Sequence, residues 1–120
     1  MRWKEKNGLS DQALAKAVDE MEQGLIDADL GGCVLKKRVA LPGRGKRGGV
    51  RVIVATKKVD RWFFLYGFGK NERNNISDKE LEIFQEMAVD LLNLNDQQVD
   101  LALSSGEFVE VLNESKENHE

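Results

Sequence analysis

The sequence contains few of the residues that support common catalytic chemistry or stabilise secreted proteins: it has one cysteine and one histidine. The single cysteine, Cys33, excludes an internal disulfide framework and a metal site built from several cysteines. The only histidine, His119, lies in a polar tail, so we predict no histidine catalysis, no metal site and no cofactor. No run of about 20 apolar residues and no signal peptide is present, so we expect a cytoplasmic protein with no membrane partner.

Charge is strongly segregated along the 120 residues, which are enough for one compact domain. Residues 34–75 hold twelve basic and two acidic side chains, a net charge of +10, whereas residues 76–120 carry −10 and residues 1–33 carry −3. So basic a segment favours a phosphate-bearing partner, the alternative being a solvated surface balanced by acidic helices. We predict one domain over residues 1–112 and a disordered polar tail over residues 113–120.

The spacing of apolar residues predicts both helices and strands. Helical periodicity and capping residues predict four helical segments, which are residues 10–23, a short turn over 25–30, residues 77–92 and residues 96–106. Runs of β-branched and aromatic residues predict strands over residues 33–40, 50–56 and 61–68, and a short one over 108–112. The strand over 61–68 is apolar on both faces, so we expect it in the centre of its sheet. This order indicates an α+β domain in which a mainly antiparallel sheet packs against N-terminal and C-terminal helices.

Five cations lie on or beside the predicted strands. They are Lys36, Arg38, Arg51, Lys70 and Arg73. If the strands are neighbours, these side chains converge near one face and one end of the sheet. Such a group can grip an RNA backbone or stabilise the charge of a crowded phosphate.

Three further cations, Arg44, Lys46 and Arg47, lie on a glycine-rich loop. The loop lacks the Gly-Lys-Ser/Thr ending of a phosphate-binding P-loop and no helix pattern follows it. These residues serve either general phosphate contact with RNA or solubility alone.

Aromatic residues fill the third predicted strand, and we expect four of them to share one face: Trp62, Phe64, Tyr66 and Phe68. Packing in the core explains Trp62 and Phe64 best, whereas Tyr66 is equally suited to stacking on a base. We expect Cys33 to be a small buried hydrophobic residue.

Three segments resemble the strand sequences of RelE-type toxins, most closely those of the HigB-like branch. They are Lys36–Val39, Gly49–Val54 and Phe64–Arg73, within a resemblance that covers roughly Trp3 to Val111. RelE-family toxins are small ribosome-dependent endoribonucleases (mRNA interferases). The resemblance therefore implies a RelE-like fold and metal-independent cleavage in which a ribose 2′-hydroxyl attacks the adjacent phosphate. Because family members use lysine and arginine where other ribonucleases use histidine, the lack of a usable histidine fits this class.

The resemblance also gives each of the five cations a role. Lys36 and Arg38 would serve as base or phosphate clamp, and Arg51 would steady the phosphate. Lys70 and Arg73 would bind the phosphate or protonate the leaving oxygen.

Departures from the family pattern define the alternatives. RelE has an arginine where this chain has Asn71, which joins the RNA-binding candidates, and a tyrosine where this chain has the helix-capping Ser77. Family members also begin with a strand before the point that matches Trp3, so we expect that first strand to be missing and a sheet edge to be unpaired. The alternative function is a non-catalytic RNA-binding or regulatory module on the same fold, an inactive or truncated toxin. A purely structural interaction domain is the third interpretation.

The resemblance implies partners as well. They are mRNA on the ribosome and a cognate antitoxin, which in the HigB-like branch is typically a helix-turn-helix DNA-binding protein. A homodimer formed through the unpaired sheet edge is a further arrangement that fits the sequence.

Overall fold

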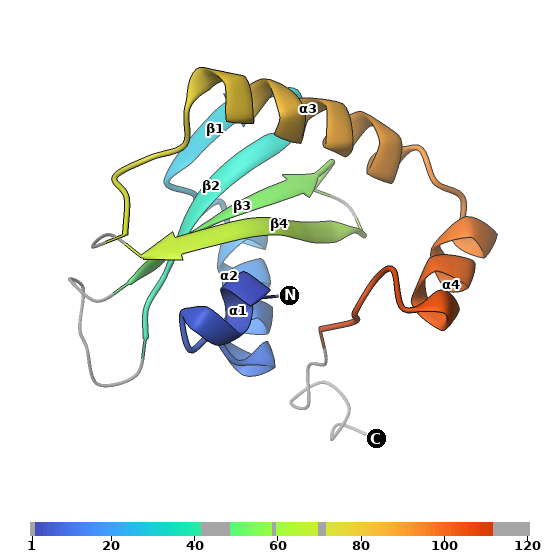
Figure 1. The fold of residues 1–120 in the computed structure, drawn as a ribbon, viewed down its shortest axis with the longest axis horizontal. Coiled ribbons are helices and arrows are strands. Elements are labelled where there is room, and N and C mark those ends of the chain that lie inside the picture. Colours follow the sequence, from blue (N-terminus) through green and yellow to red (C-terminus); the bar gives the residue numbers. More distant parts are fainter. Residues whose placement is uncertain (1, 42–48, 59, 70–71, 112–120) are drawn as a thin grey trace.

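The computed structural model describes residues 2–41, 49–58, 60–69 and 72–111. These residues form an α+β fold, as predicted, with one antiparallel sheet in the strand order β1-β2-β3-β4 (Figure 1). The elements in chain order are α1 (Arg2–Lys6), α2 (Asp11–Glu22), β1 (Ala28–Gly31), β2 (Val34–Val39), β3 (Val50–Thr56), β4 (Trp62–Gly69), α3 (Asp78–Leu92) and α4 (Asp96–Ser105). None of these helices is long and apolar enough to cross a membrane.

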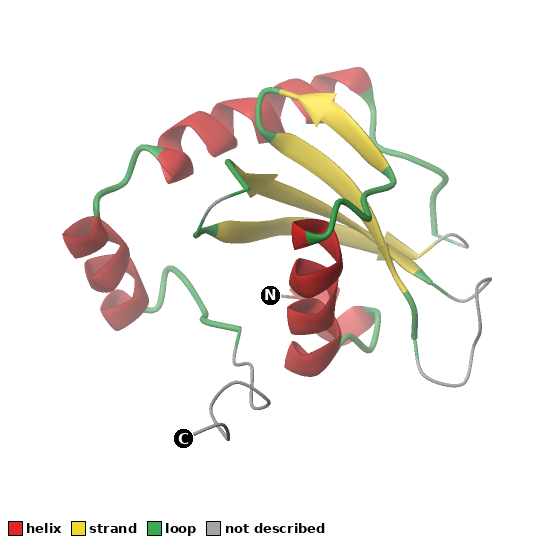
Figure 2. Cartoon of the chain, turned by 180° about the vertical axis from the view of Figure 1, so that it is seen from behind, coloured by secondary structure: helices red, strands yellow, loops and turns green. Residues whose placement is uncertain are grey.

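Two hydrophobic cores lie on the two faces of the sheet. On one face, Leu14 and Met21 of α2 pack against Val52 and other buried strand residues. On the opposite face, α3 contributes the fully buried Ala88 to a core that includes Ile53. Figure 2 shows α2 and α3 on opposite sides of the sheet. Successive side chains of the central strands β2 and β3 point to opposite faces of the sheet, so they enter different cores.

A β-bulge in β4 divides its aromatic residues between these cores. The register of β4 against β3 shifts by one residue at Leu65, which has no partner on β3. Trp62 and Phe64 therefore pack in the core on the α2 side, whereas Tyr66 and Phe68 pack in the core on the α3 side. The prediction that all four share one face is wrong because the bulge interrupts the alternation. The prediction that Trp62 and Phe64 pack in the core is confirmed.

β1 occupies a segment for which the sequence predicted a helical turn over residues 25–30. That prediction is wrong, because β1 forms a hairpin with β2. The chain reverses at Gly31, Gly32 and Cys33, whose φ angles are 84°, 61° and 64°. Glycine adopts such angles without steric cost, which favours a tight turn here. Cys33 is exposed at this turn, so the prediction that it is buried is also wrong.

β4 lies at the edge of the sheet, with β3 as its strand neighbour among the described residues. The prediction of a central position is therefore wrong, although the unpaired edge itself was expected. Its two faces are apolar because helices cover both of them. On one face, the indole of Trp3 in α1 lies directly on Gly67, where an added Cβ would be 2.6 Å from Trp3 Cε3.

The helices predicted over residues 10–23, 77–92 and 96–106 are confirmed with small differences at their ends. Asn95 caps α4, and Gly106 ends it with a φ angle of 85°. Residues 108–111 contain no strand, so the prediction of one over 108–112 is wrong for the described part of that range. The predicted tail over 113–120 lies outside the described residues.

Candidate nucleic-acid interface

Cross-strand pairing places predicted site residues on the sheet face that α3 covers. Arg38 of β2 is paired with Arg51 of β3, which is paired with Phe68 of β4. Two residues further along the strands, Lys36 of β2 is paired with Ile53 of β3, which is paired with Tyr66 of β4. Paired residues of antiparallel strands project to the same face, and Phe68 and Tyr66 belong to the core on the α3 side. The register therefore brings Lys36, Arg38 and Arg51 together on this face.

These three cations differ in their surroundings. Arg38 is exposed, while Lys36 and Arg51 are partly exposed. Arg51 Nε lies 4.0 Å from Asp27 Oδ2, whereas the described residues provide no ion-pair partner for Lys36 or Arg38. Two like charges directly opposite each other destabilise a sheet, and an anion bound between Arg38 and Arg51 would relieve that repulsion. The row therefore suits a phosphate group.

Gly49, immediately before β3, gives the Arg38 side chain its room. A Cβ at this position would lie 3.0 Å from Arg38 Cγ and 3.2 Å from Arg38 Cδ. The aliphatic stem of Arg38 thus passes over a position without a side chain. The sequence alone does not indicate this role, because the contact with Arg38 depends on the pairing of β2 with β3.

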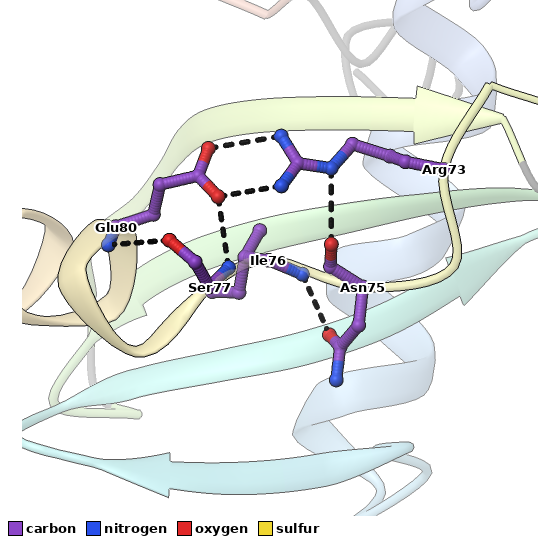
Figure 3. Close-up of polar contacts among 5 residues, drawn as sticks. All are labelled: Arg73, Asn75, Ile76, Ser77 and Glu80. Carbon is purple, nitrogen blue, oxygen red and sulfur yellow. Dashed lines mark hydrogen bonds and ion pairs between the residues drawn. The ribbon is translucent and has the colours of Figure 1, made fainter.

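A network of hydrogen bonds at the start of α3 holds the Arg73 side chain (Figure 3). Its Nη1 donates to Glu80 Oε2 at 2.9 Å, and its Nη2 donates to Glu80 Oε1 at 2.5 Å. Its Nε donates to the carbonyl oxygen of Asn75 at 3.0 Å. The guanidinium carbon also lies 5.8 Å from the ring centroid of Phe68, the strand partner of Arg51. Arg73 therefore approaches the row from the connection between β4 and α3.

Glu80 has a second role in the same network. The Ser77 N–H donates to Glu80 Oε1 at 2.8 Å, and the Glu80 N–H donates to Ser77 Oγ at 3.1 Å, which completes the predicted capping box. The hydrogen bonds from Arg73 are the main reason that the pKa of Glu80 is lowered to about 2. Glu80, and to a smaller extent Tyr66, raise the pKa of Arg73 above its usual value. Both members of the ion pair are therefore charged at neutral pH.

Tyr66 is surrounded by other aromatic rings. Its ring is stacked with Phe68 at a centroid distance of 5.9 Å and with Phe84 of α3 at 6.1 Å. These contacts favour a packing role for the ring, and the side chain also interacts with Arg73. Contact of Tyr66 with RNA stays a prediction.

Residues 1–111 match the family model described as the RelE toxin of the RelE/RelB toxin–antitoxin system. The chain belongs to the RelE toxin family. Its fold is the RelE-like fold that the sequence predicted. Comparison with curated proteins gives no match.

RelE family membership establishes a coarse function. The protein is a toxin of a toxin–antitoxin system with an antitoxin partner, and toxins of this family are in general mRNA endoribonucleases. The match extends across the described strands and helices, including the three cations Lys36, Arg38 and Arg51. The chemical roles of individual residues stay predictions.

Several predicted site residues of this RelE-family toxin lie outside the described residues. They are Lys70 and Asn71 after β4, and Arg44, Lys46 and Arg47 in the glycine-rich loop. Their expected roles stay predictions.

Other basic residues of the middle segment have structural partners. Lys37 is buried on the α2 side, where its Nζ lies 3.4 Å from Glu20 Oε1. Arg61 Nη2 donates to Asp96 Oδ1 at 2.6 Å and so joins β4 to the start of α4. The large positive charge of this segment is therefore not all available to RNA, which the charge count alone could not indicate.

No group of three or more His, Cys, Asp or Glu side chains within the described ranges could hold a metal ion. A cavity of about 470 Å³ lies between α2, the start of β4, α4 and residues 107–111. None of the described site residues on the α3 side lines it, so the cavity is separate from the site formed by Lys36, Arg38 and Arg51.

Proposed function

We propose that this RelE-family toxin is a ribosome-dependent endoribonuclease that cuts mRNA by attack of a ribose 2′-hydroxyl on the adjacent phosphate. Family membership supports the class of reaction. The observation that supports the proposed site is the strand register, which gathers Lys36, Arg38 and Arg51 on one face beside Arg73.

The reaction needs three catalytic roles from the protein. The 2′-oxygen loses a proton and forms a bond to phosphorus, and the bond from phosphorus to the 5′-oxygen breaks. The products are a 2′,3′-cyclic phosphate and a 5′-hydroxyl. A base, a group that stabilises the charge on the phosphate, and an acid for the leaving oxygen are therefore required.

The chemistry of each side chain decides which of these catalytic roles it can take. Arginine does not lose its proton in proteins, so Arg38 and Arg51 suit the clamping of phosphate oxygens. Among the described cations of this face, Lys36 is the residue that can exchange a proton, and we assign the base to it. Arg73 would contribute charge from the β4–α3 connection, and Lys70 would act with it as the resemblance implies.

The test is cleavage of mRNA on programmed ribosomes, followed by primer extension and analysis of the product ends. The wild-type protein should cut within the decoding site, and Lys36→Ala should lower the single-turnover rate by about 10²- to 10⁴-fold. Lys16→Ala is the matched control, because Lys16 is an exposed lysine on α2, on the other side of the sheet. Absence of cleavage by the wild-type protein, in an assay where an active RelE-family toxin cuts, would reject the proposal.

One observation favours a second candidate function, a non-catalytic RNA-binding module. Arg73 is already paired with Glu80, so part of the positive charge near the row is neutralised. Such a module would bind RNA with an affinity that falls as salt is added, and would leave programmed mRNA intact.

We further propose that the toxin belongs to the HigB-like branch and acts in the cytoplasm. Its antitoxin would then be a helix-turn-helix DNA-binding protein. Co-expression with the product of the neighbouring gene should yield a stable complex and restore growth. A toxin that stays active in the presence of that product would contradict this choice of partner.

A further inference from the structure

The Glu80 carboxylate joins the first turn of α3 to the basic face of the sheet. Its Oε1 accepts hydrogen bonds from the Ser77 N–H and from Arg73 Nη2, whereas its Oε2 accepts from Arg73 Nη1 (Figure 3). One side chain thus fixes both the start of the helix and the plane of the Arg73 guanidinium.

The contacts of Arg73 leave it with little freedom. A guanidinium has five N–H donors in a rigid plane, and three of them are used by Glu80 and Asn75. The guanidinium also lies over Phe68, whose ring is fully buried and therefore fixed in place. The Tyr66 side chain also interacts with the guanidinium, and the N–H donors that Glu80, Asn75 and Tyr66 leave unused are available to a ligand. The guanidinium carbon lies 5.8 Å from the ring centroid of Phe68, the strand partner of Arg51.

Helix capping and surface charge do not account for this arrangement. The capping box needs only the contacts between Glu80 and Ser77, and a carboxylate in the first turn of a helix is favourable without any arginine. The side chains of Arg73 and Glu80 are 32% and 34% exposed, so solvent screens part of the stabilisation that their ion pair provides. The two hydrogen bonds from Arg73 to the two carboxylate oxygens of Glu80, here called the fork, have a clearer effect on geometry, because they select one orientation of the Arg73 guanidinium.

We infer that Glu80 is a positioning residue of the toxin, which holds the Arg73 guanidinium ready to bind the same phosphate as Arg51. This inference rests on the proposed function. Preorganised donors contribute most to catalysis when they need not reorient as charge develops on the phosphate. Glu80 itself does not touch the substrate and acts through Arg73.

The opposite role for Glu80 makes a different prediction. If the carboxylate competes with RNA for Arg73, its neutralisation should free the arginine and raise both RNA affinity and the cleavage rate. If it positions Arg73, its neutralisation should lower the rate. The sign of the effect of Glu80→Gln therefore separates the two.

The experiment measures single-turnover cleavage on programmed ribosomes for Glu80→Gln, with Ser77→Ala as the matched control. Ser77→Ala removes the other half of the capping box and leaves the fork with Arg73 in place. Glu80→Gln should lower the rate by about 10- to 100-fold, mainly in the rate constant at saturating toxin, whereas Ser77→Ala should change it by less than about twofold at a similar loss of thermal stability. In an Arg73→Ala background, Glu80→Gln should cause no further loss, because the group that it positions is absent.

Three results would overturn the inference: a rate for Glu80→Gln equal to that of Ser77→Ala, a higher rate than wild type, or a full additional loss in the Arg73→Ala background. If the wild-type protein binds ribosomes and cuts nothing, the proposed function fails separately. The inference is then decided by affinity for a single-stranded RNA oligonucleotide. Glu80→Gln should weaken that affinity only when Arg73 is present, and unchanged affinity would reject it.

Discussion

Arg38 and Arg51 lie directly opposite each other on β2 and β3, so that two positive charges share one row of the sheet. Such a pair opposes folding, because like charges on facing positions repel. The row continues to the buried Phe68, over which Arg73 lies. Stability alone would favour a neutral residue at one of these positions. Binding of an anionic ligand between them explains the presence of two arginines.

Replacing one member of this pair should therefore separate stability from activity. We expect Arg38→Ala to leave the free energy of unfolding unchanged or to raise it by up to about 0.5 kcal/mol, because the repulsion from Arg51 is removed. The same variant should lose at least about tenfold in cleavage rate, as a phosphate ligand is lost. Urea unfolding and ribosome cleavage assays measure the two effects. A variant that is clearly less stable and fully active would contradict this interpretation.

The space above Gly49 should matter for Arg38 in particular. Gly49→Ala would place a Cβ 3.0 Å from Arg38 Cγ, which is closer than ordinary van der Waals contact between two carbon atoms. We expect a loss of roughly 1 to 2 kcal/mol in unfolding free energy, because the arginine stem must move. In an Arg38→Ala background, which retains the contact with the Val39 carbonyl oxygen, the same change should cost less. Equal losses in both backgrounds would show that Arg38 is not the residue displaced.

Local features of the sequence predicted much of this fold. The helices at 10–23 and 77–92 follow from apolar spacing and from capping by Ser10 and Ser77, both of which bond to backbone N–H groups. The strands over 50–56 and 61–68 follow from runs of β-branched and aromatic residues. These signals act within a few residues of each other, so they are visible before any tertiary contact is known.

Tertiary contacts decide the features that the sequence did not predict. The bulge at Leu65 changes which face each aromatic residue enters, and no local pattern marks it. β4 has the apolar residues on both faces that are typical of a central strand. These residues pack against helices on the two faces of the sheet, while β4 itself lies at the edge. The fork from Arg73 to Glu80 spans seven positions across a turn, whereas the capping box within the helix could be seen from spacing alone.

The ion pair of Glu80 with Arg73 should make stability depend on pH in the acid range. In the folded protein the pKa of Glu80 is lowered from its usual 4.5 to about 2. At pH values between these two, the unfolded chain binds a proton that the folded chain does not. The contribution of this carboxylate is therefore fully present above about pH 4.5 and is lost as pH falls towards 2.

Thermal melting of wild type and Glu80→Gln between pH 2 and pH 6 checks this dependence. The difference in melting temperature between the two proteins should shrink as pH is lowered through this window. Arg73→Ala should show a shallower dependence than wild type, because the main cause of the lowered pKa is removed. A constant difference across the whole range would contradict the assignment.

The contact between Trp3 and Gly67 should determine how firmly α1 is held on β4. Gly67→Ala would place a Cβ 2.6 Å from Trp3 Cε3, a distance that the indole can relieve only by moving away from the strand. We expect a loss of about 1 to 3 kcal/mol in unfolding free energy. The fluorescence of Trp3, measured in a Trp62→Phe background, should shift towards that of an exposed indole. In a Trp3→Ala background, where the clash is absent, Gly67→Ala should cost much less, because Val52 Cγ1, at 3.4 Å, is then the nearest remaining neighbour of the new Cβ. An equally large loss in that background would mean that the strand itself, and not its contact with α1, requires glycine at this position.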